Sequence, residues 1–337
     1  MYHYSLGGGT IFYYKKFLRI VSAFLSVIIS FSLIIAFCPT VAAEELDRDI
    51  AVEKMTRGFY NFESKIDMSG CGVTPQNIGE LFIYALKNDP YLFFVDTKLS
   101  YLYSKSGGKM EIYPKYNMSA EDAASALIFC KSEIKRLADS ADKRMNDAEK
   151  ALYIHDLICA QYSYDSTYKF TDMFGFLSTK TGTCQGYAWT YMAVLRELGI
   201  DCCYIASDSI NHIWNMVNID GEWYHCDLTW DDGGKERDRR HFLNSDKKAA
   251  SQGHKDWYSA YGESCTSEKY DDMDLSQLTH DLYSGDADHS STVELYDLLV
   301  MISEQQKLCP MCADINADLV CDELDAILFR DAILETN

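Results

Sequence analysis

Positive charge is scarce in this chain. Lysine and arginine together number 31, against 51 aspartates and glutamates, so the 337 residues carry a formal net charge of −20. An acidic chain of this kind repels phosphate backbones and anionic membrane surfaces, and no basic patch interrupts the pattern. We therefore exclude nucleic-acid binding and charge-driven membrane binding as main functions.

Two further absences narrow the class of protein. The 12 cysteines lack the dense spacing of a small disulfide-stabilised scaffold. No pair of carboxylates stands out in the pattern used for glycoside hydrolysis. The whole chain is 47% hydrophobic and 24% charged, which is typical of a globular protein rather than a disordered one. The length suits one large domain or two ordinary ones.

The first 43 residues have the features of an export signal. Lys15, Lys16 and Arg19 precede an apolar run over 20–37, and small residues at 41–43 suit a signal peptidase. We expect cleavage after residue 43 and a secreted or cell-surface protein. A single membrane anchor is the alternative, because the run is close to the minimum length of a span. Cleavage would remove these three basic residues and no acidic ones, which leaves the mature chain more acidic and without a membrane segment.

The remaining chain divides into four predicted regions. Residues 44–170 favour helices over 74–86, 119–138 and from 147, with strands over 91–95, 98–104 and 109–113. Residues 171–260 favour a helix from Cys184 that ends before Gly199, a strand over 202–207, and a hairpin over 212–219 and 222–229. Residues 261–283 are polar and are predicted to be a linker. Residues 284–337 contain a twofold duplication, described below.

Cys184 is the residue that says most about chemistry. It opens a helix, and His212 and Asp227 follow it in the chain. A thiol, a base and a carboxylate are the minimum needed for covalent acyl transfer. Backbone amides at a helix start favour a thiolate and can also stabilise an oxyanion. We further expect Gly182 and Gly186 to let a substrate chain approach closely.

The hairpin register tests whether the base and the carboxylate can meet. With a two-residue turn at 220–221, Ile219 pairs with Glu222, and this register places Asp227 on the same face as His212, in a diagonal position. A slip of one residue would put them on opposite faces. We predict that Asp227 fixes the tautomer of His212, which leaves the other ring nitrogen for Cys184.

Three motifs carry a family resemblance: Gly-Thr-Cys-Gln-Gly-Tyr-Ala at 182–188, Asn-His-Ile-Trp-Asn at 211–215, and Glu-Trp-Tyr-His-Cys-Asp-Leu-Thr-Trp-Asp at 222–231. In this order the chain resembles the transglutaminase-like core, and residues 50–258 are similar to bacterial exported members. The resemblance implies an α+β, papain-like fold in which a helix bearing the cysteine packs on an antiparallel sheet. It implies Cys184 as nucleophile, His212 as base and Asp227 as orienting carboxylate, with no cofactor for the catalytic core. In the family a tryptophan before the nucleophile often stabilises the transition state. None lies between 51 and Cys184, and Gln185 or Tyr187 are candidate substitutes.

Three cysteines and a histidine elsewhere in this region raise the question of a zinc site. Cys202, Cys203, His225 and Cys226 are residue types that bind zinc, but neighbouring residues of a strand point to opposite faces, so Cys202 and Cys203 cannot easily share one ion. We therefore do not expect a zinc site there.

The duplicated C-terminal region has the ligand spacing of calcium loops. In both units the residues at positions one, three, five and twelve carry side-chain oxygens, position seven offers its backbone carbonyl, and the second unit adds an aspartate at position nine, as calcium loops place their ligands. The predicted ligands are Asp286, Asp288, Ser290, Thr292 and Asp297 in the first unit, and Asp314, Asn316, Asp318, Val320, Asp322 and Asp325 in the second. A pair of acidic helix caps is the alternative. Position six, usually glycine, is Ser291 or Leu319, and a serine replaces an acid in the first unit, so we expect the first site to be weaker.

The two loops together resemble a type I dockerin. That resemblance implies Ca²⁺ as the cofactor and the cohesin domain of a scaffoldin as the partner, in a bacterial cellulosome-type assembly. The sequence thus predicts an exported thiol enzyme that acts on protein or peptide substrates through a thioacyl intermediate, which either water or an amine then attacks. Two alternatives remain: a catalytically inactive binding module, and a dockerin-borne component of polysaccharide degradation.

Overall fold

The computed structural model describes residues 46–104, 108–232, 238–259 and 263–278, together with positions 325, 327, 328 and 330. The predicted signal segment lies outside these residues. So do all the predicted calcium ligands except Asp325, which is a buried residue in helical conformation. Within the described residues we find no helix with the length and apolar character needed to cross a bilayer.

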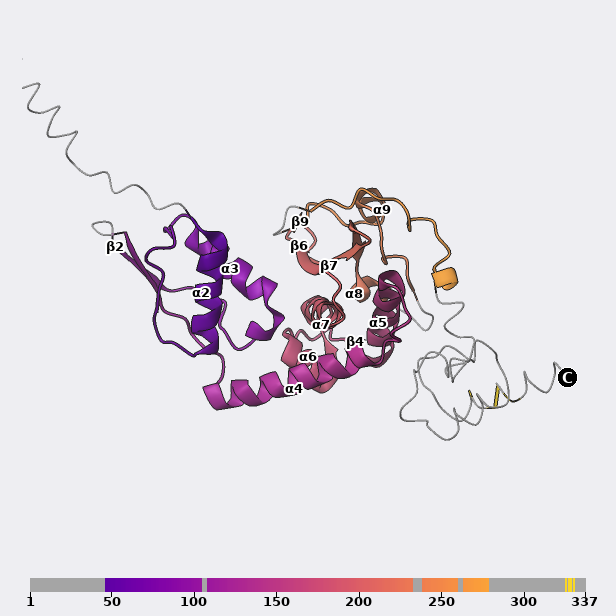
Figure 1. Ribbon diagram of the computed structural model, residues 1–337, viewed down its shortest axis with the longest axis horizontal. Coiled ribbons are helices and arrows are strands. Elements are labelled where there is room, and N and C mark those ends of the chain that lie inside the picture. The colour runs from indigo at the N-terminus through magenta and orange to yellow at the C-terminus, as the bar shows by residue number, and fades with distance from the viewer. Residues whose placement is uncertain are drawn as a thin grey trace, which may run out of the picture.

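The N-terminal part combines two helices with a small antiparallel sheet (Figure 1). Helix α2 spans Arg48–Tyr60 and helix α3 spans Ile78–Asn88. The sheet has the order β1 (Ile66–Asp67), β3 (Lys109–Ile112), β2 (Tyr101–Ser104). These helices and this sheet correspond to the helical region with a short β insert that the sequence predicts.

Two predicted elements in this part are wrong. The strand expected over 91–95 is instead a short 3-10 helix, η1 (Pro90–Leu92), because the Asp89 carboxylate accepts the N–H of Tyr91 at 3.0 Å and turns the chain. The strand pairing in this segment is limited to one isolated bridge, between Val95 and Tyr116. The helix expected from 74 begins later, at α3, because Asn77 Oδ1 accepts the N–H of Thr74 at 2.8 Å and holds the preceding residues in a turn.

Three helices connect this part to the sheet that follows. The longest, α4 (Ala120–Asp139), begins where predicted, because Ser119 Oγ accepts the N–H of Asp122 at 3.1 Å. Helix α5 (Asp147–Gln161) starts with a capping box between Asn146 and Glu149, which satisfies exposed N–H groups at both residues. Helix α6 (Met173–Thr179) is short and is capped by Asp172.

Helix α7 (Cys184–Glu197) is the centre of the fold. It packs against α4, α5 and α6 and against strands β6 and β7, and Figure 1 shows it end-on between the sheet and these helices. The sheet has the antiparallel order β8 (Glu222–Cys226), β7 (His212–Ile219), β6 (Cys202–Ser207), β9 (Tyr258–Ser259). The remaining elements are the parallel pair β4 (Ser163–Tyr164) and β5 (Thr181–Gly182), helices α8 (Leu228–Asp231) and α9 (Asp246–Ser251), and the 3-10 helix η2 (Leu275–Leu278). A cysteine-bearing helix on an antiparallel sheet is the α+β arrangement expected.

The β7–β8 hairpin has the predicted register. Ile219 pairs with Glu222, and the ladder continues to Asn215 and Cys226. The turn residues at 220 and 221 have φ of 56° and 87°, the left-handed values that a two-residue hairpin turn requires. Strand β8 ends earlier than predicted, because the residue after Cys226 caps helix α8 instead of continuing the ladder.

The two faces of this sheet are buried by different cores. One continuous apolar cluster runs from Ala51 to Tyr270, without a break at the predicted boundary near 170, and it covers the face against α7. A smaller cluster covers the opposite face and contains Cys203, Ile205, Trp214, Met216 and Cys265. Residues that alternate along the strands therefore enter separate cores, and the end of the sheet is left to build the site.

Candidate active site

Cys184 is the first residue of α7 and is half-buried. The segment before it is held by the β4–β5 pair, in which Tyr164 pairs with Gly182, and by the Thr183 N–H, which donates to the Phe170 carbonyl at 3.1 Å. The thiol is thus fixed at a helix start by regular backbone pairing rather than carried on a free loop.

The two glycines near Cys184, Gly182 and Gly186, lie against the side chain of Phe176. A Cβ at Gly186 would lie 2.8 Å from atoms of the Phe176 side chain, and one at Gly182 would lie 2.7 Å from the same ring. Both distances are shorter than side chains tolerate. The glycines therefore allow Phe176 to pack beneath the helix start.

His212 and Asp227 meet as the register predicts. His212 begins β7, Asp227 follows β8, and His212 Nε2 lies 2.7 Å from Asp227 Oδ2. The other carboxylate oxygen accepts the N–H groups of Thr229 at 3.1 Å and Trp230 at 3.3 Å. With Nε2 engaged by the carboxylate, Nδ1 is the imidazole nitrogen left for the thiol of Cys184.

The charges of this pair support each other. Burial works against a charged imidazole, but the Asp227 carboxylate and a hydrogen bond with Cys184 outweigh it and raise the pKa of His212 to about 9. Burial likewise opposes a charged Asp227, yet the positive charge and hydrogen bond of His212, helped by His254, hold the pKa of its carboxyl far below the usual range. At neutral pH the site therefore contains an imidazolium bonded to a carboxylate.

His254 is a member of this cluster that the sequence analysis did not single out. Its Nε2 lies 2.8 Å from the same Asp227 Oδ2, and its side chain is buried. The imidazole of His212 stacks on Trp230 with ring centroids 5.1 Å apart, and that of His254 packs on Trp230 in a tilted arrangement with centroids 4.1 Å apart. A lone histidine in a polar segment without periodicity gave no signal that would place it here.

A cleft of about 380 Å³ opens at the cysteine. Besides Cys184 and His212, its lining includes Lys87, Tyr164, Gln185, Tyr204 and Tyr258. Lys87 comes from α3, so both parts of the chain form the cleft, and its ammonium donates to the Tyr258 hydroxyl at 2.9 Å.

Donors for a developing oxyanion are available at the helix start. The N–H groups of Gly186 and Tyr187 both donate to the Thr183 carbonyl. In the described part of the chain no hydrogen bond engages the N–H of Cys184 or Gln185, which are the first amides of α7 and so have no partner within the helix. Of the two predicted substitutes for tryptophan, Gln185 lines the cleft. Tyr187 does not, because it is buried and its hydroxyl donates to Asp232.

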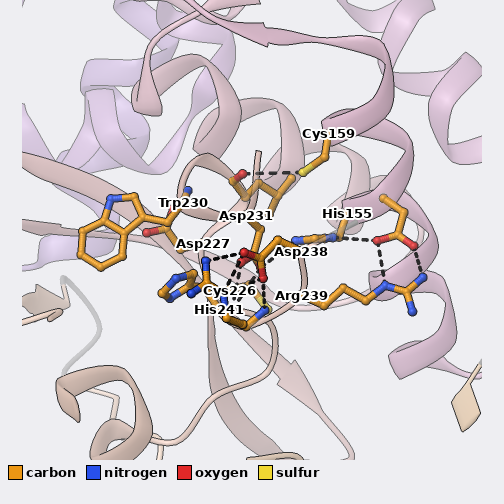
Figure 2. Close-up of polar contacts among 12 residues, drawn as sticks. His155, Cys159, Cys226, Asp227, Trp230, Asp231, Asp238, Arg239 and His241 are labelled. Atoms are coloured by element: carbon orange, nitrogen blue, oxygen red, sulfur yellow. Dashed lines mark hydrogen bonds and ion pairs between the residues drawn. The ribbon is translucent and has the colours of Figure 1, made fainter. Parts of the chain in front are cut away.

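A buried ion network supports the turn that carries Asp227 (Figure 2). His155 on α5 bonds the Asp156 carboxylate through Nδ1 at 3.0 Å and the Asp231 carboxylate through Nε2 at 3.1 Å. Arg239 is paired with Asp156, and the His241 N–H donates to Asp231 at 3.1 Å. Burial opposes the charge of His155, but its two carboxylates raise its pKa to about 9. The network ties α5 to α8.

Two clusters of histidine and acidic or thiol side chains have the spacing of a metal site in the described part of the chain. Asp227, His212 and His254 bring ligand atoms within 4.8 Å of one another, as do His225, Asp246 and Cys265. Trp214 Nε1 donates to His225 Nδ1 at 3.0 Å, which fixes a proton on the nitrogen facing Asp246 and disqualifies it as a ligand.

The predicted opposition of the two adjacent strand cysteines is confirmed. Cys202 lies in the large core and Cys203 in the small one, so they do not share an ion. None of the cysteines among the described residues forms a disulfide bond.

Comparison with known proteins identifies one region of the chain. Residues 135–228 match the model of the transglutaminase-like superfamily, and this region contains Cys184, His212 and Asp227. The chain therefore carries a transglutaminase-like domain. His254 lies beyond the matched residues.

Two curated relatives and several solved structures are similar to parts of the chain. The kyphoscoliosis peptidases of Mus musculus and Homo sapiens are each 26% identical over 136 residues, which is 33% of this chain and 20% of the relative. This chain thus spans about a fifth of those relatives. A crystal structure of a TGase has a TM-score of 0.29 at 16% identity and covers 42% of this chain and 46% of its own. A cysteine protease candidate from Cytophaga hutchinsonii has a TM-score of 0.27 at 16% identity, covering 39% and 61%.

Proposed function

We propose that this protein is a thiol-dependent acyl-transfer enzyme in which Cys184 is the nucleophile, His212 the acid and base, and Asp227 the orienting carboxylate. The observation that carries the proposal is the bond from His212 Nε2 to Asp227 Oδ2 at 2.7 Å, which leaves Nδ1 for the thiol at the mouth of the cleft. The match to the transglutaminase-like superfamily over 135–228 supports a thiol enzyme.

Acylation would proceed by attack of the Cys184 thiolate on an amide carbonyl. The carbonyl oxygen takes up the negative charge of the tetrahedral intermediate, within reach of the N–H groups of Cys184 and Gln185. The C–N bond then breaks as His212 Nδ1–H gives its proton to the departing amine. The products of this step are a thioester on Cys184, a free amine and a neutral His212.

Deacylation would return the site to its starting state. Neutral His212 removes a proton from the acceptor as the acceptor attacks the thioester carbonyl, and collapse of the second tetrahedral intermediate releases the Cys184 thiolate. Water as acceptor gives hydrolysis, and a primary amine gives a new amide. We favour protein or peptide amides as substrates, because the two curated relatives are named as peptidases.

The location of the enzyme is the second part of the proposal. Residues 1–43 have the pattern of an export signal, and residues 284–337 have the ligand spacing of two calcium loops. We therefore propose an exported enzyme that binds Ca²⁺ and is tethered through a dockerin to a cohesin of a cellulosome-type scaffold. The test is to measure cohesin binding before and after a chelator removes Ca²⁺. We expect the chelator to abolish binding and added Ca²⁺ to restore it.

The catalytic proposal is tested with the full-length chain, iodoacetamide and a casein substrate. Labelling of Cys184, located by peptide mass spectrometry, is expected at neutral pH, together with release of peptides or ammonia or incorporation of a fluorescent amine. Cys184→Ala should abolish all of these, whereas Cys159→Ala should leave them intact, since Cys159 donates to the Leu228 carbonyl at 3.6 Å and lies outside the cleft lining. An unreactive Cys184 in a folded protein that still binds cohesin would instead favour a binding module.

A further inference from the structure

Asp227 is bonded to two histidines through one oxygen atom. Its Oδ2 lies 2.7 Å from His212 Nε2 and 2.8 Å from His254 Nε2, and all three side chains are buried. A triad needs only the first of these contacts. The second comes from a residue 27 positions along the chain, beyond helix α9, and brings a polar ring into a site that burial makes costly for unpaired polar atoms.

The two distances indicate hydrogen bonds rather than places for a metal ion. Nitrogen and oxygen ligands of a tetrahedral zinc ion, each about 2.0–2.1 Å from the metal, lie roughly 3.3 Å from each other. The observed contacts of 2.7 and 2.8 Å are shorter and fall in the range of charge-assisted hydrogen bonds. Each ring therefore directs an N–H at the carboxylate.

The geometry also shows what His254 does not touch. It is absent from the lining of the cleft that contains Cys184 and His212. Its ring packs instead on Trp214 at 4.6 Å and Trp230 at 4.1 Å, and no hydrogen-bond partner engages its Nδ1 in the described part of the chain. Among the described residues, the one polar partner of His254 is the carboxylate that orients the proposed catalytic base.

We infer that His254 is a positioning residue, which holds Asp227 Oδ2 in line with His212 and takes up part of the carboxylate charge. The inference rests on the proposed function, because it assigns His254 a role in the reaction of Cys184. The carboxylate has four donors in all, since its other oxygen accepts two backbone N–H groups of α8. Removal of one imidazole donor leaves Asp227 free to tilt and leaves its charge concentrated on His212.

Two substitutions separate this role from simple packing. His254→Phe keeps an aromatic ring against Trp214 and Trp230 but removes the N–H donor. His254→Gln loses the ring but keeps an N–H that reaches the carboxylate. A matched control is His225→Gln, because His225 is equally buried and bonds Trp214 and Asp246 but does not contact Asp227.

The first measurement is the NMR titration of the His212 imidazole in the full chain, assigned with His212→Gln. The titratable groups that face His212 are Cys184 from α7, Asp227 from the β8–α8 turn and His254, and those around His254 include His225 and His241. Loss of the donor should raise the His212 midpoint in His254→Phe by at least about half a pH unit, because a more basic carboxylate holds the imidazolium more strongly. His254→Gln and His225→Gln should stay near the wild-type value.

The second measurement is kcat and KM for the substrate processed by the wild-type enzyme. Loss of alignment should lower kcat roughly tenfold in His254→Phe with little change in KM, and His254→Gln should restore most of it. Equal midpoints in all three variants, or equal effects of Phe and Gln, would overturn the inference. The titration needs no turnover, so a wild-type protein without activity would refute the proposed function and still leave His254 tested. If His254→Phe does not fold, the smaller His254→Leu removes the same donor.

Discussion

Nε2 of His155 lies 3.1 Å from Oδ2 of Asp231, although 76 positions separate the two residues in the chain. This contact fastens α8 to α5, and α8 is the turn whose first N–H groups hold the Asp227 carboxylate. The carboxylate that we propose orients His212 is therefore held by a turn that a buried charge network outside the cleft supports, and Figure 2 shows the contacts of that network.

Removal of the His155 imidazolium from this network should lower the free energy of unfolding. His155→Leu leaves the carboxylates of Asp156 and Asp231 buried without their shared partner, and loss of one partner of a buried ion pair typically costs about 3–5 kcal/mol. Urea denaturation should report this loss in free energy of unfolding. The control is Lys135→Gln, which breaks an exposed pair with Asp139 and should change the same quantity by less than about 0.5 kcal/mol. Equal effects of the two substitutions would show that the buried network does not stabilise the fold.

The same imidazoles predict a pH dependence of stability. The pKa values of His155 and His212 are both raised from 6.5 to about 9, so their stabilising contribution is complete below pH 6.5 and is lost as pH rises through 9. The free energy of unfolding should therefore fall between pH 7 and pH 10. His155→Gln and His212→Gln should each weaken that slope. A wild-type curve that is flat over this range would contradict the assigned charges.

Asp227 should control the protonation state of His212, the proposed base. In Asp227→Asn the carboxylate charge that favours the imidazolium is gone while burial remains, so the pKa of His212 falls from about 9 toward or below its ordinary value. The rate of iodoacetamide labelling of Cys184 near pH 7 should then drop, and kcat/KM should fall by about three to four orders of magnitude. Asp246→Asn is the matched control, because Asp246 bonds His225 away from the thiol and its loss should cost less than about tenfold.

The sequence predicted the parts of this site that depend on local chemistry. The turn at 220–221 fixed the hairpin register, and the register fixed the meeting of His212 with Asp227. The predicted secondary structure was wrong where a side chain altered the local backbone. Asp89 turned the expected strand over 91–95 into η1, and Asp227 ended β8 early by capping α8. Neither effect is visible in periodicity, because an aspartate before an apolar run suits a loop, a cap or a strand end equally.

The remaining parts depend on contacts between distant segments. His254 and Lys87 reach the site through tertiary packing, and no spacing rule connects position 87 or 254 to position 184. The contact of the glycines at 182 and 186 with Phe176 is likewise invisible in the sequence, because it arises only when α6 packs on α7. Sequence patterns predict contacts between residues of the same helix, strand or hairpin, but not contacts that form only when separate elements pack together.

The two calcium loops that we propose over residues 284–337 should differ in affinity. Calorimetry on the full chain is expected to find two Ca²⁺ sites, and the loop that starts at Asp314 should be the tighter, because Ser290 replaces an acidic ligand in the loop that starts at Asp286. Asp286→Ala should remove the weaker site and Asp314→Ala the tighter one. Absence of both sites would favour the alternative of two acidic helix caps. Reversed affinities would show that the unusual leucine at 319 costs more than the missing carboxylate.

The helix start at Cys184 should tolerate no side chain at position 186. In Gly186→Ala the new Cβ meets Phe176 atoms at 2.8 Å, so either the ring or the first turn of α7 must move, and overpacking of this kind costs about 1–3 kcal/mol. The displaced turn carries the thiol and the free amides, so kcat should fall with the free energy of unfolding. Gly79 supplies the matched control, because it lies in α3 with nothing within 4 Å of an added Cβ. Gly79→Ala should stabilise the protein by about 0.5–1 kcal/mol through helix propensity and leave turnover unchanged. If both substitutions stabilise the protein, Phe176 has room to relax, and the packing beneath Cys184 is looser than these contacts require.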